Sequence, residues 1–518
     1  MGGGQPVREC LRVSLHAVPP PLDEDDPGSF PPDALPVQPH TGPRLLSLHD
    51  EDVAQAIIDT IAEKTGAPPV YAEGKLWRYD GRGIWEPQPD ADIRNLVCSW
   101  NGTPIVGKDG LAKTRKGKPP PMFAGTQRAA ETALKRTVDR TQDLTFFDSS
   151  ATGVMFRDRF VRVTETGDVV ECAPSPECRA TFRIDEPYPE NPLAPPEEYI
   201  DMMFRAFGGE DDDKLGKIAA IQEWFGLALI GKPTNDAALY LLGPERSGKS
   251  VTAKVGLGVF PPSVRAAISL KSLDPGSAAG GKAEYYLAQL AGVRINADLD
   301  LPGGQFIQGE NFKKIVTGEP LSGRFPGGKA FTFTPRAAML FAGESLPTPE
   351  DKNRGFFRRW LVIRYRNQVD PRDVVQNYER IILAKERALI AAWFIQGAAA
   401  SIKRGGFVIP PSVAAEIPKW VLETDYTAQW CAQFCIPAPN MPRAQWPTAS
   451  SFYNRFREWS ASNGHGTKSS NTFSKDLKRC LASDLCYEDR NGVTRWGYRY
   501  ETPSIGPEKP DDIGWKTK

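Results

Sequence analysis

The pattern of apolar positions predicts a small α+β domain near the start of the chain. Apolar residues recur on one helical face in DEDVAQAIIDTIAEKTG, residues 50–66. Two aromatic runs in GKLWRYDGRGIWEPQ are separated by Asp80-Gly81, which favours a hairpin. A second strand pair is expected in GVMFRDRFVRVTETGDVVECA, with Thr166-Gly167-Asp168 as its turn. We therefore expect an N-terminal α+β domain over residues 49–195.

The middle of the chain shows a different pattern. Residues 196–232 carry helical periodicity that ends in EWFGLALIG before Pro233, which predicts a helical linker or collar. Strand-like and helix-like runs then alternate over residues 233–372, as in an α/β core. Residues 373–437 read as a helical segment, with a Gly-Gly-Pro-Pro break at residues 405–411 and a further helix through Phe434.

The two ends are expected to differ from each other. Residues 438–502 contain two amphipathic stretches, SSFYNRFREWSAS and SNTFSKDLKRCLA, followed by two strand-like runs around Asn491-Gly492. Two helices followed by a hairpin predict a winged-helix domain. Residues 1–48 hold nine prolines between positions 19 and 43, which predicts a disordered arm. Residues 503–518 are expected to form a tail.

Composition excludes several classes of protein. Lysine plus arginine equals aspartate plus glutamate at 64 each, so any basic surface must be local. The longest apolar run, from Ala388 to Ile402, contains Gln396 and is shorter than the ~18 residues that span a bilayer. The eight cysteines lack paired zinc-site spacing; Cys431 and Cys435, with His465, are the remaining metal candidates. We expect a cytoplasmic protein without a membrane partner, in a bacterial or phage-infected cell.

A phosphate-binding loop is expected in the stretch LYLLGPERSGKSVTAK. It satisfies G-x-x-x-x-G-K-[ST] between a buried strand and a helix, so backbone N–H groups can surround the phosphates of ATP. Lys249 would neutralise phosphate oxygens, and the hydroxyl of Ser250 would bind Mg²⁺. The residues expected to bind ATP are Gly243, Pro244, Glu245, Arg246, Ser247, Gly248, Lys249, Ser250 and Val251.

Carboxylates follow two of the later strands. In LAGVRINADLDLPGG a short strand ends at Asp298, and Asp300 stands two residues further on. Two side chains spaced by two in extended backbone share a face, so both could reach one Mg²⁺ ion. The pattern does not choose between them, and either could instead lie on a loop without this role. The strand in AAMLFAG ends at Glu344, where a polar side chain could sense the γ-phosphate.

Two sets of basic residues lie after these aspartates in the chain. LSGRF and KAFTF flank Pro326-Gly327-Gly328, which predicts a hairpin with Arg324 and Lys329 near its tip. Such a hairpin could hold a DNA backbone or be a solvated surface feature. Arg358 and Arg359 precede a hydrophobic strand, where guanidinium groups could stabilise phosphoryl transfer across a subunit interface or pair with surface acids.

The C-terminal domain offers a second candidate DNA surface. Its expected recognition helix and wing carry Lys475, Lys478, Arg479, Arg490, Arg495, Trp496 and Arg499. These residues could contact DNA phosphates, or the wing could instead bind protein. The basic loop at residues 108–121 is more typical of a solvated insertion.

The ordered set of motifs resembles the superfamily 3 helicases, in particular the helicase half of phage and plasmid primase-helicases, which are related to the poxvirus primase-helicase. GPERSGKS is similar to their Walker A motif, INADLD to Walker B and FKKIVTGEPLSGRFPGGKAFTF to their basic hairpin. FAGESLP is similar to their sensor and GFFRRWLVI to their arginine motif. LWRYDGRGIW, GVMFRDRFVRV and EWFGLALIGKP resemble their N-terminal region, so the likeness covers about residues 70–500.

The resemblance implies an AAA+ core and a hexameric ring that hydrolyses ATP with Mg²⁺ and moves on single-stranded DNA, typically 3′ to 5′. Lys249 and Ser250 would then bind nucleotide, Asp298 or Asp300 would serve Mg²⁺, Lys329 would grip DNA, and Arg358 or Arg359 would be the arginine finger. This family usually has Asn where Glu344 stands. The first 195 residues lack the motifs of a primase, so we expect no primer synthesis by this chain alone; a separate primase is a possible partner.

Two further functions remain open on the sequence. An ATP-regulated replication initiator would bind an origin in duplex DNA with little unwinding. A P-loop small-molecule kinase is disfavoured, because no acceptor lid is evident and a winged helix would have no purpose there.

Overall fold

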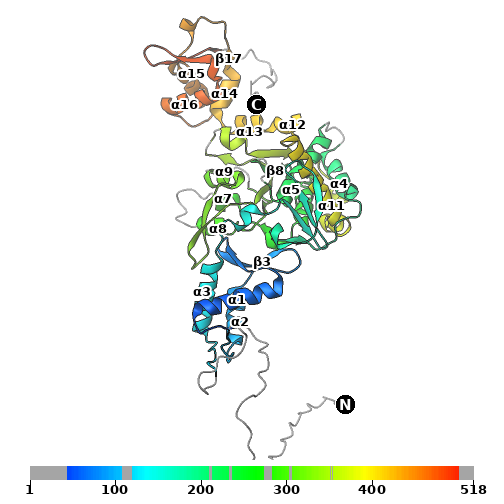
Figure 1. Cartoon of the computed structure of the whole chain (residues 1–518). Coiled ribbons are helices and arrows are strands. Elements are labelled where there is room, and N and C mark those ends of the chain that lie inside the picture. The colour runs from blue at the N-terminus through cyan, green and yellow to red at the C-terminus, as the bar shows by residue number, and fades with distance from the viewer. Residues whose placement is uncertain are drawn as a thin grey trace, which may run out of the picture.

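The computed structural model describes residues 44–107, 120–208, 213–232, 236–273, 283–302, 306–307, 309–350, 352 and 354–500. Most of the proline-rich arm, the basic loop up to residue 119 and the tail lie outside these ranges. Figure 1 shows three bodies in a row, with the first helices at one end, a large α/β body in the middle and a small C-terminal unit at the other end. Within the described ranges, no helix combines the length and hydropathy needed to cross a membrane.

The first body combines three helices with a small antiparallel sheet in the order β1-β2-β3. Its elements are α1 (Asp50–Thr65), β1 (Val70–Ala72), β2 (Lys75–Tyr79), β3 (Trp85–Pro87), α2 (Asp90–Ser99) and α3 (Gln127–Thr141). The helix expected over residues 50–66 and the hairpin around Asp80-Gly81 are confirmed. Acidic residues occupy the first turn of α1, and Gly66 ends it with φ +87°.

A second sheet packs against the central body rather than against these helices. It has the order β6-β5-β4-β7, and its strands are β4 (Gly153–Phe156), β5 (Phe160–Val163), β6 (Val169–Cys172) and β7 (Arg183–Ile184). Phe156 and Val161 share a hydrophobic core with Trp224 of the helix α5 (Lys214–Ile230). This sheet buries one apolar face on α5, and at its other side Arg183 pairs with Asp80 of the first hairpin, so residues 49–195 contact both bodies.

The central body is built on five parallel strands in the order β16-β8-β14-β10-β9. The α/β class expected from the sequence is confirmed. The strands are β8 (Ala238–Leu242), β9 (Arg265–Ala266), β10 (Ile295–Asp298), β14 (Ala338–Gly343) and β16 (Trp360–Arg364). Every residue of β8 is buried, as expected for a strand covered on both faces.

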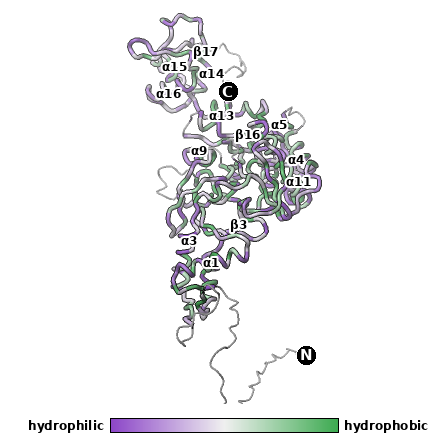
Figure 2. The backbone as a smooth tube through the Cα atoms, in the orientation of Figure 1, coloured by the Kyte–Doolittle hydropathy of each residue, from purple (hydrophilic) through white to green (hydrophobic). Residues whose placement is uncertain are grey.

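Alternate residues of β8 enter two different cores. Leu239 and Leu241 pack on one face of the sheet with α4 (Glu197–Phe207), α5, α6 (Lys249–Val259) and α11 (Tyr378–Arg404). Tyr240 and Leu242 pack on the other face with shorter elements. These include α7 (Leu270–Leu273), α8 (Ala283–Ala288), α9 (Glu310–Thr317), α10 (Arg354–Phe357) and α13 (Glu416–Thr424). Figure 2 shows hydrophobic positions among the packed segments of the central body.

Smaller pairings lie around this sheet. The antiparallel pair β12 (Leu321–Arg324) and β13 (Ala330–Phe333) forms the expected hairpin. A parallel pair joins β11 (Phe306–Ile307) to β15 (Thr348–Pro349). Short 3-10 turns occur at η1 (Phe146–Ser149), η2 (Pro176–Cys178), η3 (Pro262–Val264), η5 (Pro371–Asp373), η6 (Arg443–Gln445) and η7 (Ser483–Leu485).

The C-terminal unit begins earlier than the expected residue 438. The single helix expected through Phe434 is divided into α12 (Pro411–Ala414), α13 and α14 (Tyr426–Phe434). Asp425 breaks it, because its extended backbone lets the carboxylate accept a hydrogen bond from the N–H of Thr427 and cap α14. The rest comprises β17 (Cys435–Pro437), α15 (Ala449–Ser462), α16 (Ser470–Cys480), β18 (Cys486–Glu488), β19 (Thr494–Trp496) and β20 (Tyr498–Tyr500).

Packing explains this boundary. Trp430 of α14 is fully buried against Phe452 of α15 and Phe473 of α16. The strand β17 pairs with β20. The unit is therefore two helices and a β18–β19 hairpin, as expected, with α14 and β17 added to its core.

Candidate functional site

The glycine-rich loop connects β8 to α6 at the carboxyl edge of the central sheet. Gly248 has φ +89°, and a Cβ there would lie 2.7 Å from the Cβ of Ala206. A Cβ on Gly243 would lie 2.7 Å from the carbonyl oxygen of Tyr365. Glycine is therefore required at both positions, by backbone conformation at one and by close packing at both.

Buried hydroxyl groups hold the start of α6, and sequence patterns did not reveal them. The hydroxyl of Tyr365 donates to Thr252 Oγ1 at 3.0 Å, and Thr252 Oγ1 donates to the carbonyl of Gly248 at 3.1 Å. The hydroxyl of Tyr199, on α4, donates to the carbonyl of Thr252 at 3.0 Å. Burial raises the pKa of both tyrosines, so they stay neutral donors. The loop is thus positioned by α4 and by the residue that follows β16.

The loop has the donors that a phosphate group requires. The Oγ atom of Ser247 is buried and has no hydrogen-bond partner in the described structure. Lys249 is 7% exposed, and its Nζ donates to the carbonyl of Pro244 at 2.9 Å across the loop. The N-terminus of the 11-residue α6 adds unpaired N–H groups and a positive dipole end. These residues fit the phosphates of ATP. Ser250 is exposed on the first turn of α6.

The strand order brings the two candidate aspartates to the same edge as the loop. β14 lies between β8 and β10, and Asp298 is level with Phe341 of β14. Two strand spacings separate β8 from β10, which is about 10 Å. The backbone then continues along β14, since the N–H of Leu301 donates to the carbonyl of Ala342 at 2.9 Å.

Asp298 and Asp300 have different surroundings. Asp298 is partly buried, and its carboxylate accepts a hydrogen bond from the N–H of Leu270 at 3.3 Å. Burial raises the pKa of Asp298, and the nearby Asp300 carboxylate adds to this. Asp300 is exposed just beyond the strand. Two residues before Asp298, the fully buried Asn296 exchanges two hydrogen bonds with the backbone of Ile268. Asn296 and Asp298 therefore both attach the segment before α7 to β10.

No cluster of three or more His, Cys, Asp or Glu side chains poised to hold a metal occurs within the described ranges. A Mg²⁺ site of the expected kind need not be preformed, since this ion keeps waters and takes phosphate oxygens of the nucleotide as ligands. Ser250, Asp298 and Asp300 would supply the protein oxygens. Bound there, Mg²⁺ would neutralise charge on the phosphates.

Glu344 follows β14 at the centre of this edge. Its side chain is exposed, and none of the described residues forms a hydrogen bond or ion pair with it. The next residue, Ser345, accepts a hydrogen bond through its carbonyl from the hydroxyl of Tyr240 at 2.7 Å. Burial and the Asp298 carboxylate raise the pKa of Tyr240. The Tyr240 side chain thus extends from β8 to the carboxyl end of β14 and lies near Asp298 of β10. Tyr240 was not singled out from the sequence.

The two cations of the hairpin are held differently. Lys329 is exposed beside the turn, where Gly327 has φ +75°. Arg324 instead contacts α8, where its Nη2 donates to the hydroxyl of Tyr285 at 3.1 Å and its Nε lies 3.4 Å from Glu284 Oε2. Phe325 stacks on Phe331, with ring centroids 5.1 Å apart. Lys329 is thus the more accessible of the two expected DNA contacts.

Arg358 and Arg359 lie at the opposite edge of the sheet from the glycine loop. The N–H of Ala238, at the start of β8, donates to the carbonyl of Arg359 at 2.8 Å. The five residues of β8 place this edge roughly 15 Å from the loop of the same chain. Arg359 is 9% exposed and its Nη1 donates to the carbonyl of Gly355, whereas Arg358 is exposed. A role in phosphoryl transfer would therefore require a second subunit, and Arg358 is the better placed of the pair.

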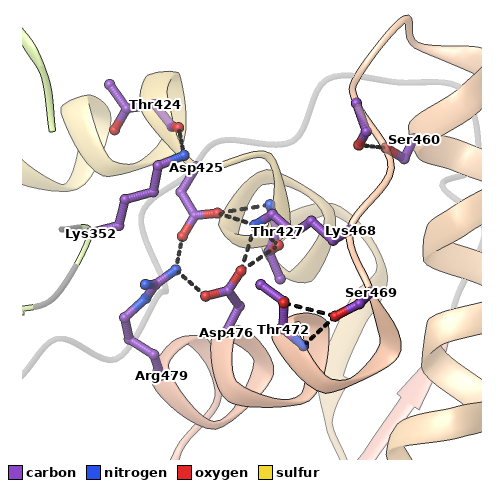
Figure 3. A network of polar contacts seen from close by, with 11 residues as sticks. Lys352, Thr424, Asp425, Thr427, Ser460, Lys468, Ser469, Thr472, Asp476 and Arg479 are labelled. Carbon is purple, nitrogen blue, oxygen red and sulfur yellow. Dashed lines mark hydrogen bonds and ion pairs between the residues drawn. The ribbon is translucent and has the colours of Figure 1, made fainter. Parts of the chain in front are cut away.

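The cations of the C-terminal unit also differ in whether they are exposed or engaged in ion pairs. Lys475 and Lys478 are exposed on α16. Arg479 points inward to Asp425 and Asp476, as Figure 3 shows. Arg495 is paired with Asp489 at 2.8 Å. Lys475, Lys478, Arg490 and Arg499 are the exposed members of this expected DNA surface, whereas Trp496 is buried in the core of the unit.

No family model and no curated protein sequence matches the chain. Among solved structures, the chain is similar to forms of the NrS-1 C-terminal region. An apo form covers 85% of this chain and 98% of the other, with a TM-score of 0.38 and 11% identity. A second covers 66% and 95%, with a TM-score of 0.36 and 11% identity, and a third covers 54% and 74%, with a TM-score of 0.34 and 14% identity.

Proposed function

We propose that this protein is an ATP-dependent DNA helicase, a ring-forming motor of the superfamily 3 type with an AAA+ P-loop core and a C-terminal winged helix. The observation that carries the proposal is the meeting of three features at one sheet edge. These are the glycine loop ending in Lys249, the aspartates Asp298 and Asp300, and Glu344, which directly follows strand β14. This is where a nucleotide held by the loop would present its phosphates.

In this proposal each group has one task. Lys249 leaves the carbonyl of Pro244 to bind the phosphates, and the N–H groups of the loop bind the remaining oxygens. Ser250 and Asp300 would supply oxygen ligands to Mg²⁺. Asp298 would be the second acid at this edge, and its carboxylate also keeps α7 attached to β10. Glu344 adds a negative charge near the γ-phosphate. This charge is unfavourable there unless a cation pairs with Glu344. A neighbouring subunit would bring such a cation.

The position of Arg358 supports assembly into a ring. Because the arginine pair precedes β16 at the edge opposite to the loop, it cannot reach a nucleotide in its own chain. In a head-to-tail ring, of which a hexamer is the proposed form, this edge of one subunit would face the loop of the next. The exposed Lys329 would then contact the phosphate backbone of single-stranded DNA in the centre.

The test is strand displacement coupled to ATP hydrolysis. We expect the purified chain to hydrolyse ATP with Mg²⁺, to be stimulated by single-stranded DNA, and to displace a strand from a tailed duplex. Lys249→Ala should abolish hydrolysis and displacement while leaving folding intact. Displacement that survives Lys249→Ala would overturn the mechanism. Sequence-specific duplex binding without displacement would instead indicate an ATP-regulated initiator that binds a replication origin.

A further inference from the structure

A cavity lies at the amino edge of the central sheet, away from the glycine loop. It has a volume of about 290 Å³ and is formed between this edge, the end of α5 and the segment that precedes β4. Three cations line it, namely Lys232, Arg294 and Arg336. The nucleotide-binding proposal uses none of them. The volume is far more than the roughly 15 Å³ that one water molecule requires.

Two of the three cations already have carboxylate partners. Lys232 Nζ lies 2.8 Å from Glu165 Oε1, and Arg336 Nη2 lies 3.0 Å from Asp148 Oδ1. Arg336 Nη1 also lies 3.5 Å from Ser150 Oγ. These pairs give the cavity a fixed polar wall.

Arg294 has no such partner. It is 6% exposed, and no hydrogen bond or ion pair to its guanidinium occurs among the described residues. Its recorded contact is with the face of Phe182, 5.9 Å from the ring centroid, which does not neutralise the charge. The group occupies the space beside Gly231, where a Cβ would lie 1.7 Å from Arg294 Nη1. The buried Glu73 carboxyl interacts with Arg294 electrostatically but forms no hydrogen bond with it, so the charge is only partly compensated, which is unfavourable at this depth.

The neighbouring arginine increases this imbalance. The N–H of Ala338 donates to the carbonyl of Arg294 at 2.9 Å, which brings Arg294 and Arg336 to adjacent strand ends. Burial and the charge of Arg336 lower the pKa of Arg294 to about 10, and Glu73 offsets only part of this. An anion between the two guanidinium groups would relieve both effects.

We propose that this cavity binds a phosphate group through Arg294 and Arg336. Guanidinium groups bind phosphate oxygens through paired hydrogen bonds, and two of them match its double charge. The phosphate comes either from free inorganic phosphate or from a nucleic-acid backbone. The site is separate from the glycine loop, because it lies at the opposite edge of the sheet.

The experiment uses the full chain carrying Lys249→Ala, so that the glycine loop does not contribute. Inorganic phosphate is titrated by calorimetry, and Arg294→Gln and Arg336→Gln are compared with Arg82→Gln, an exposed arginine outside the cavity. We expect one phosphate per chain, an affinity loss of about tenfold or more for each cavity variant, and no change for Arg82→Gln. Absent binding, or equal affinity in all variants, would overturn the proposal.

A second measurement guards against misfolding of the Arg294 variant. Crystals of the Lys249→Ala chain soaked in tungstate should show an anomalous peak between Arg294 and Arg336, and its absence there would contradict the site. A single-stranded oligonucleotide then identifies the source. If Arg336→Gln weakens phosphate and oligonucleotide binding alike, the site holds a backbone phosphate. If it weakens only phosphate binding, the site holds the free ion.

Discussion

The guanidinium of Arg479, on α16, forms an ion pair with the carboxylate of Asp425, which is fully buried between α13 and α14. Lys468 joins the same carboxylate at 3.5 Å, as Figure 3 shows. Lys352, from the segment between Glu344 and Arg358, donates to the carbonyl of Thr424 at 2.5 Å. This polar network connects the central body to the C-terminal unit.

Removing the pair should therefore affect stability more than DNA binding. Breaking a buried ion pair costs about 3–5 kcal/mol, and because Lys468 still neutralises Asp425 we expect Arg479→Ala to cost about 2 kcal/mol. The exposed Lys475 is the matched control, since Lys475→Ala should change stability by less than about 0.5 kcal/mol. Urea unfolding measures both. Equal stability of the two variants would contradict the inward role of Arg479.

The arginine pair can be tested by mixing subunits. Arg358→Ala should lower the ATPase rate by about 10³-fold, the lower end for loss of an arginine finger. Lys249→Ala subunits are inactive but still carry Arg358. Mixing the two variants should restore part of the activity, because some interfaces then combine an intact loop with an intact arginine. No recovery on mixing, in rings that have formed, would exclude action across the interface.

Arg359→Ala provides the comparison for this experiment. Because Arg359 is 9% exposed and bonds the carbonyl of Gly355, its loss should lower the unfolding midpoint. A variant with normal stability and a lost ATPase would instead assign the finger to Arg359.

The two aspartates should separate in their effects. We expect Asp300→Asn to lower the ATPase rate by about 10–100-fold and to raise the Mg²⁺ concentration needed for half-maximal rate, with stability unchanged. Asp298→Asn should not lower stability at neutral pH, because burial and Asp300 already disfavour its charged form in the folded state. ATPase assays over a Mg²⁺ series and thermal unfolding measure these effects. A larger Mg²⁺ requirement for Asp298→Asn than for Asp300→Asn would make Asp298 the principal metal ligand.

The hairpin offers a salt-dependence test. Lys329→Ala should weaken single-stranded DNA binding and lower the slope of log affinity against log salt by about 1, as expected for one lost phosphate contact. Arg324→Ala should leave that slope nearly unchanged, because Arg324 is already engaged by Glu284 and Tyr285. Fluorescence anisotropy between low and moderate salt measures both slopes.

A pH dependence is expected from Glu73, in the turn between β1 and β2. Burial raises the pKa of Glu73 above its ordinary 4.5, while Arg336, Arg294 and Lys75 oppose this and Asp148 adds to it. The folded state then holds the Glu73 proton more tightly than the unfolded state, so stability falls as pH rises from about 4.5 through the raised pKa. Glu73→Gln should remove this fall, so the wild type should lose stability relative to the variant across this range. Unfolding midpoints over a pH series would contradict this if the difference were constant or reversed.

Local chemistry made several elements predictable. The helix at residues 50–66, the buried strand β8 and the hairpin around Gly327 follow from periodicity, capping and turn residues, which act over a few positions. The division at Asp425 was missed, because the helical pattern continues on both sides and the break depends on a side chain that caps α14. The placement of β4–β7 was missed because it depends on the apolar face of α5.

The sequence by itself determined which groups this protein has for its chemistry: a glycine loop with Lys249, two aspartates, a basic hairpin and an arginine pair. Motifs of this kind depend on spacing along the chain, which the sequence states directly. Only the tertiary structure decided which groups meet and which are already engaged. The strand order places Asp298 at the same sheet edge as the loop and Arg358 at the opposite edge. Ion pairs engage Arg324 with Glu284 and Arg479 with Asp425. It also gathers Arg294 and Arg336, distant in sequence, at one sheet edge, because adjacent parallel strands begin side by side.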